Sequence, residues 1–135
     1  MPTKIEKWYP LFVFVVGLFL YMNTLNHEFT QDDAIVITQN QFTKKGFEGI
    51  GPILGNDTFL GYFGDSDKLN LVAGGRYRPL SLVIFASVYE FVGENPFFFH
   101  LLNVLLYCLL GSVIYILAKK MFTNLFPDPS ICALL

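Results

Sequence analysis

The chain has 135 residues, of which 53% are hydrophobic and 15% are charged, and its mean hydropathy is +0.49. A charged fraction well below the roughly 25% of soluble domains argues against a soluble globular protein and indicates an all-α integral membrane protein. The net charge of −2 argues against a nucleic-acid partner.

Residues 8–25 are predicted to form the first transmembrane helix. They follow a short charged N-terminus, residues 1–7, and contain no charged side chain. The length is close to the roughly 20 residues that a spanning helix needs, and Trp8 and Tyr21 lie near its ends as in an aromatic belt. A cleaved signal peptide is the alternative. The bulky residues after Tyr21 offer no small-residue cleavage site, which favours an uncleaved anchor.

Residues 26–95 are expected to form a large outer loop that bears short interfacial helices. The main one covers residues 80–92, because Pro79 suits the first helical position and Gly93 suits the end of a helix. At 1.5 Å per residue this helix is about 20 Å long, which is too short to cross a hydrocarbon core of about 30 Å. It is therefore expected to lie at the membrane surface or to dip into the membrane, and not to span it.

Earlier in this loop, the sequence predicts two shorter helices. The first is expected from Asp33 to Asn40. The second is expected from Lys44 to Leu54, where glycines and a proline interrupt it. A turn is predicted to follow at Gly55.

A second transmembrane helix is predicted over residues 96–118. Residues 119–129, which begin with two lysines, are expected to form a cytoplasmic loop, and residues 130–135 to begin a third span of a longer multi-pass protein. Lysines on the N-terminal side of the first span and after the second place both ends in the cytoplasm by the positive-inside rule. Residues 26–95 then face the periplasm or the lumen of the endoplasmic reticulum.

Two adjacent carboxylates, Asp32 and Asp33, lie a few residues past the first span. An acidic pair at the boundary between water and membrane suits proton abstraction or cation binding. The alternative is a structural role, because Asp is common at helix N-termini and Asp33 could cap the helix that follows.

Other polar side chains accompany this pair. Arg78 stands at the start of the interfacial helix, beside Tyr77, and His100 and Asn103 share one face of the second span. Polar side chains at membrane depth are costly and often functional, although hydrogen bonding between helices explains them equally well. Snorkelling is the alternative reading for Arg78.

Together these residues suit transfer from a lipid-linked phosphosugar. Such a donor buries its tail in the bilayer and presents its phosphate at the surface, where Arg78 can bind it with charge-assisted hydrogen bonds. A carboxylate can accept the proton of an acceptor hydroxyl, which typically contributes about 10² to 10⁴ in rate.

Several short motifs resemble the N-terminal region of GT-C-fold membrane glycosyltransferases. The resemblance covers roughly residues 10–120 and is strongest to the protein O-mannosyltransferase-like group, with its bacterial relatives, that carries transmembrane helices followed by tetratricopeptide repeats. The matching pieces are Phe29-x-x-Asp32-Asp33, Ile37-x-x-Asn40, Tyr77-Arg78-Pro79-Leu80 and Phe99-His100-Leu101-x-Asn103.

The resemblance implies that this chain is the N-terminal part of a multi-pass GT-C-like helical bundle. It implies Asp32 as the catalytic base and Asp33 as an orienting or acceptor-binding neighbour, at a position where relatives often carry Glu. It also implies that Arg78 binds the donor phosphate. For His100 and Asn103 the resemblance gives only the pattern and no role; with Tyr77 and Asn40 they are candidates for support of the site.

The implied donor is a polyprenyl- or dolichyl-phosphate sugar, and the acceptor is a protein or glycan hydroxyl. Residues 1–135 alone are expected to be inactive. The alternative is a non-enzymatic membrane protein, either a transporter segment or an assembly anchor, in which the carboxylates bind a cation or cap a helix. No metal-ligand spacing is present and no cofactor is firmly predicted, although Asp32 and Asp33 could assist a divalent ion.

Overall fold

The computed structural model describes residues 6–65, 68 and 77–125, and its regular elements in these ranges are all helical. The chain divides into two compact units, one made of residues 1–25 and 100–135 and the other of residues 26–99. The expected third span lies outside the described residues.

The first unit is built on the two long apolar helices. The 3-10 turn η1 (Glu6–Trp8) leads into α1 (Tyr9–Tyr21), and the 3-10 turn η2 (Met22–Asn26) extends it. The second long helix is α6 (Pro96–Leu125). By length and composition, Tyr9–Asn26 and Pro96–Thr123 could each cross a membrane. Both helical segments agree with the expected spans, while their placement in a membrane stays a prediction.

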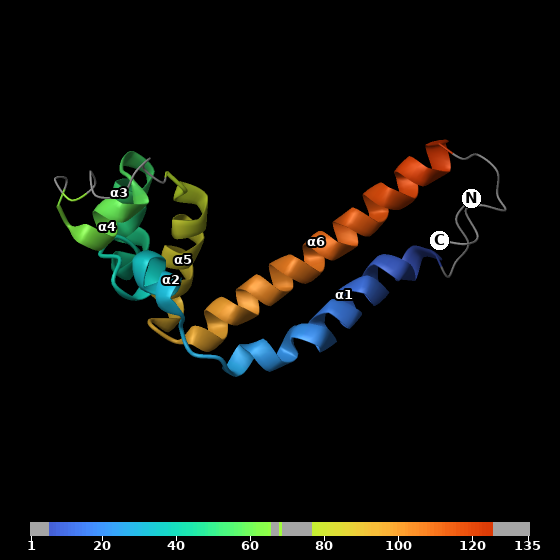
Figure 1. Cartoon of the computed structure of the whole chain (residues 1–135), viewed down its shortest axis with the longest axis horizontal. Coiled ribbons are helices and arrows are strands. Elements are labelled where there is room, and N and C mark those ends of the chain that lie inside the picture. The colour runs from blue at the N-terminus through green and yellow to red at the C-terminus, as the bar shows by residue number, and fades with distance from the viewer. Residues whose placement is uncertain (1–5, 66–67, 69–76, 126–135) are drawn as a thin grey trace. The chain divides into compact units, whose positions relative to one another are not determined.

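Small side chains let α1 and α6 lie side by side (Figure 1). Ser112 donates a hydrogen bond from its hydroxyl to the carbonyl oxygen of Pro10 at 2.9 Å. A Cβ atom added to Gly17 would lie only 3.0 Å from the Cys108 sulfur, so the two backbones are close there. Small residues are typical of contacts between helices in membranes, because van der Waals packing drives their association.

Helix α6 is longer than expected. It continues through residues 119–125, which were expected to lie in a loop, as far as Leu125, the last residue that the structure describes. This stretch contains no glycine or proline, and the first helix-breaking residue that follows it in the sequence is Pro127. The charged pair Lys119 and Lys120 therefore ends the apolar run without ending the helix.

The second unit consists of short helices and one longer helix: α2 (Gln31–Asp33), the π-helix η3 (Ala34–Thr38), the 3-10 helix η4 (Thr43–Gly49), α3 (Ile50–Gly55), α4 (Thr58–Phe63) and α5 (Pro79–Val92). Helices are present near the three places where the sequence predicted them, residues 33–40, 44–54 and 80–92, whereas α4 was not expected. The predicted turn after α3 is also present, where Asp57 caps α4 by accepting a hydrogen bond from the Phe59 N–H at 2.8 Å.

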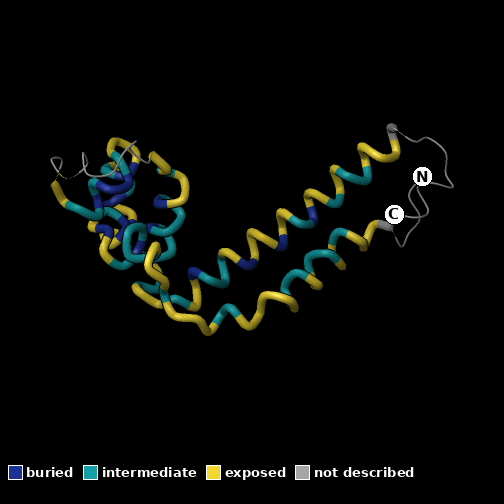
Figure 2. The backbone as a smooth tube through the Cα atoms, in the orientation of Figure 1, coloured by how far each residue is buried: buried dark blue, intermediate teal, exposed yellow. Residues whose placement is uncertain are grey.

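The core of this unit lies where α5 packs against the shorter helices. Ile53 from α3 and Leu82 and Ala86 from α5 are buried together. Figure 2 shows the buried positions gathered among these helices. The opposite side of α5 is also apolar, with Leu80 and Phe91 strongly exposed. At 14 residues, α5 is shorter than a membrane span.

Candidate functional site

The acidic pair stands on the first turn of a short helix, α2 continued by η3. Thr30 is the residue before this helix and has an extended backbone. The Asp33 carboxylate oxygen Oδ2 accepts hydrogen bonds from the Thr30 N–H at 2.7 Å and from the Thr30 hydroxyl at 3.1 Å. This is the reciprocal half of a capping box, in which an acidic side chain reaches back to the N-cap backbone. Asp33 thus has a defined structural task.

Asp32 differs from its neighbour. Its side chain is exposed, and within the described part of the chain its carboxylate forms no hydrogen bond or ion pair. The two carboxylates therefore differ in their contacts. Asp33 bonds to Thr30 and fixes the turn, whereas the Asp32 carboxylate projects from that turn into solvent. This geometry suits Asp32 for contact with a ligand and leaves Asp33 as a positioning neighbour.

Asn40 has a structural role that the sequence did not reveal. Its side chain is completely buried, at 0% exposure. The amide nitrogen donates to the carbonyl oxygens of Ile35 at 2.9 Å and Thr58 at 3.1 Å. The amide oxygen accepts from the N–H groups of Phe42 at 3.1 Å and Thr43 at 3.2 Å. Both donors and both acceptor positions are used, so Asn40 holds three segments together and cannot bind a ligand without losing these bonds.

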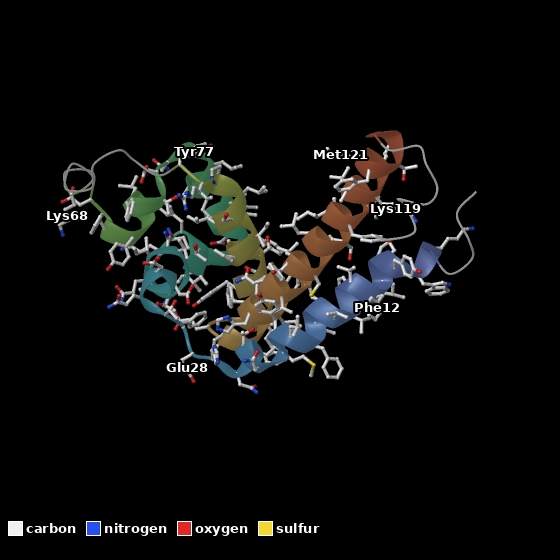
Figure 3. The ribbon with its side chains drawn as sticks, turned by 45° about the vertical axis from the view of Figure 1, so that its right-hand side comes forward. Phe12, Glu28, Lys68, Tyr77, Lys119 and Met121 are labelled. Carbon is white, nitrogen blue, oxygen red and sulfur yellow. The ribbon has the colours of Figure 1, made fainter. Side chains whose placement is uncertain are left out.

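Arg78 and Tyr77 stand at the beginning of α5. Arg78 is the exposed residue before the helix, and Pro79 occupies its first turn as predicted. The Tyr77 hydroxyl, labelled in Figure 3, donates to the Leu54 carbonyl oxygen at 2.8 Å and so ties this start to the end of α3. Within the described residues no ion pair or hydrogen bond joins Arg78 to Asp32.

A surface ion pair joins η4 to the residues after α5. Lys44 and Glu94 form a salt bridge of 2.5 Å between side chains that are each 42% exposed. The hydrogen bond to Glu94 raises the pKa of Lys44 above its ordinary value, and the same bond lowers the pKa of Glu94. Sequence reasoning missed this pair because its members are far apart in the chain.

His100 and Asn103 belong to the first unit, on the early turns of α6. His100 is half-buried and Asn103 is exposed. The preceding residue, Phe99, belongs to the second unit and is buried there against Phe29, with ring centroids 5.6 Å apart. Phe29 of the acidic motif therefore anchors the segment that leads to the carboxylates.

Across the described ranges, no group of three or more His, Cys, Asp or Glu side chains is arranged to hold a metal ion. Cys108 is buried beside Gly17 and forms no disulfide within the described residues.

The sequence is similar to curated protein O-mannosyl-transferases. It is 33% identical over 105 residues to protein O-mannosyl-transferase TMTC1 of Mus musculus, a match that covers 77% of this chain and 11% of that protein. It is 32% identical over 107 residues to protein O-mannosyl-transferase tmtc2 of Xenopus laevis, a match that covers 79% of this chain and 12% of that protein. It is 30% identical over 105 residues to protein O-mannosyl-transferase Tmtc1 of Drosophila melanogaster, which covers 78% of this chain and 12% of that protein. The chain thus spans about one-ninth of these relatives. No protein-family model and no solved structure matches it.

Proposed function

We propose that this chain is part of an integral-membrane glycosyltransferase that transfers a mannose-like hexose from a polyprenyl or dolichyl phosphate to a hydroxyl group of a protein acceptor. The similarity to protein O-mannosyl-transferases supports this reaction class. The observation that carries the proposal is the exposed carboxylate of Asp32, held on a capped turn and engaged by no other described group.

In the proposed reaction Asp32 accepts the proton of the acceptor hydroxyl. The acceptor oxygen forms a bond to the anomeric carbon of the sugar while the bond from that carbon to the lipid phosphate breaks. The electron pair leaves with the phosphate, and the configuration at the anomeric carbon inverts. Arg78 stabilises the charge on the departing phosphate, since a guanidinium binds phosphate oxygens with strong charge-assisted hydrogen bonds.

The proposal includes the membrane arrangement. The two apolar helices cross the bilayer, and residues 26–95 lie on the outer face, the periplasm or lumen, because the lysines before the first span and after the second favour the cytoplasm. Helix α5 lies at the membrane surface, where the exposed side chains Leu80 and Phe91 meet the acyl boundary. A GT-C-like bundle requires further spans, and tetratricopeptide repeats would follow them.

The test uses the full-length protein in native membranes supplied with labelled polyprenyl- and dolichyl-phosphate sugars. Transfer of label to protein is expected with a mannose-like donor. Arg78→Gln is expected to raise the donor KM more than Arg78→Lys does, because Lys keeps the charge. Absence of transfer from every donor would contradict the proposal and favour a transporter segment or an assembly anchor. Chelation with EDTA in the same assay tests whether a divalent ion assists the acidic pair.

A further inference from the structure

The helix that carries the acidic pair ends in a π-helix. Over Ala34–Thr38 the backbone is wound more loosely than an α-helix, and the Gln39 N–H bonds to the Ala34 carbonyl oxygen at 2.9 Å. Such turns are rare and are found frequently at functional sites. The end of any helix also leaves its last carbonyl oxygens without backbone donors. Here the helix is short, so those carbonyls belong to residues that follow Asp32 by only three to six positions in the sequence.

Side chains from the following segment bind these carbonyl oxygens. The Thr43 hydroxyl donates to the Val36 carbonyl at 2.7 Å, and the Asn40 amide donates to the Ile35 carbonyl at 2.9 Å. The Lys44 ammonium group reaches the Thr38 carbonyl at 3.2 Å. We call the set Asn40, Thr43 and Lys44 the carbonyl clamp.

Two members of the carbonyl clamp are themselves firmly held. Asn40 and Thr43 are both at 0% exposure. The Thr43 N–H donates to the Asn40 amide oxygen, and the Asn40 amide also reaches Thr58 at the start of α4. A buried polar group that loses its partner costs about 1–3 kcal/mol, so this arrangement has few alternatives.

We infer that the carbonyl clamp, and Thr43 in particular, positions Asp32 for catalysis. The capping box fixes the helix at Thr30 and Asp33, and the clamp fixes its other end, so the backbone of Asp32 is held from both sides. Thr43 acts through this helix and touches no substrate. The inference rests on the proposed function, because it assigns Thr43 as a positioning residue for the proposed base.

The first test is kinetic and uses the full-length protein in membranes. Thr43→Val keeps the size of the side chain and removes its donor, whereas Thr43→Ser keeps the donor. Because a misplacement of about 1 Å can cost about 100-fold in rate, Thr43→Val is expected to lower kcat by roughly 10- to 100-fold with little change in KM. Thr43→Ser is expected to restore most of the rate. In an Asp32→Asn background, Thr43→Val is expected to cause no further loss.

The second test does not depend on activity. Hydrogen exchange of the backbone amides in residues 31–40 is measured for the wild type and both variants. These amides are expected to exchange faster in Thr43→Val than in the wild type. In Thr43→Ser they are expected to exchange at the wild-type rate. Unchanged exchange in Thr43→Val overturns the inference whatever the rates are. Equal kcat in Thr43→Val and wild type also overturns it. A wild type that transfers no sugar overturns the proposed function, and with it the catalytic role of Thr43, while the exchange rates still decide whether the clamp holds the helix.

Discussion

The carboxylate of Asp33 accepts a hydrogen bond from the backbone N–H of Thr30 at 2.7 Å, and this bond closes the turn from which Asp32 projects. Asp33→Ala removes this acceptor and is expected to destabilise the protein by about 0.5–2 kcal/mol, as for other helix caps. Thermal unfolding of the purified protein measures the change. Asp33→Asn keeps an acceptor oxygen and should lose less; equal stability of Asp33→Ala and wild type would contradict the capping role.

Asn40→Leu is expected to be among the most destabilising substitutions in the second unit. Leucine has no amide, so the carbonyl oxygens of Ile35 and Thr58 lose their donor. The N–H groups of Phe42 and Thr43 lose the side-chain oxygen to which they donate. Since each lost partner of a buried group costs about 1–3 kcal/mol, the total should reach roughly 3 kcal/mol or more. Denaturant unfolding followed by circular dichroism gives the value. Gln39→Leu changes an exposed neighbour and provides the control; a similar loss in both variants would refute the bonding role.

Gly61→Ala is expected to destabilise α4 and its contact with Asn40. A Cβ atom at Gly61 would lie only 2.3 Å from the Asn40 amide oxygen, so the bonded amide would have to move. Gly51→Ala is the matched control, because nothing lies within 4 Å of the added atom in α3. That control should stabilise by roughly 0.5–1 kcal/mol through lower entropy of the unfolded chain. Melting temperatures that shift in the same direction for both variants would contradict the close contact.

The ion pair of Lys44 and Glu94 predicts a small pH dependence of stability. The folded-state pKa of Glu94 is lowered from 4.5, so its contribution is present above pH 4.5 and is lost as the pH falls through the lower value. The pKa of Lys44 is raised from 10.5, so its contribution is present below pH 10.5 and is lost as the pH rises further. The pair therefore stabilises between these limits.

Because both side chains are well exposed, the gain from this pair should be below about 1 kcal/mol and should shrink in high salt. Lys44→Met should remove it and flatten the pH profile of the melting temperature. Lys45→Met, at an exposed neighbour, should leave the profile unchanged. A pH profile that Lys44→Met leaves intact would show that the pair contributes nothing.

Apart from α4, the sequence predicted where the helices of both units lie, because their signals are local. Apolar runs without charge mark α1 and α6, and the Pro79 and Gly93 boundaries of α5 agree with the structure, where Gly93 has a φ of 62°. The predicted end of α6 was wrong, because the helix continues past Lys119 and Lys120. Charged residues mark where a helix leaves the lipid, but they do not stop the helix, which a proline or glycine does.

The site was less predictable. The sequence indicated that Asp33 could cap a helix. That its partner is Thr30, and that Asp32 is exposed, became visible only in the structure. The carbonyl clamp was missed except for Asn40, since the bond from Thr43 to Val36 depends on a chain reversal that no periodic pattern encodes. Long-range partners such as Thr58 for Asn40 are set by tertiary packing.

The most direct test of the account compares Asp32→Asn with Glu28→Gln in the full-length protein, at equal expression and membrane insertion. Both changes neutralise an exposed carboxylate of the same segment, and Asn keeps the size of Asp. With a labelled polyprenyl-phosphate sugar, Asp32→Asn is expected to lower the transfer rate by about 10² or more, and Glu28→Gln to leave it close to wild type. Equal transfer by wild type and Asp32→Asn would contradict the assignment of Asp32 as the catalytic base.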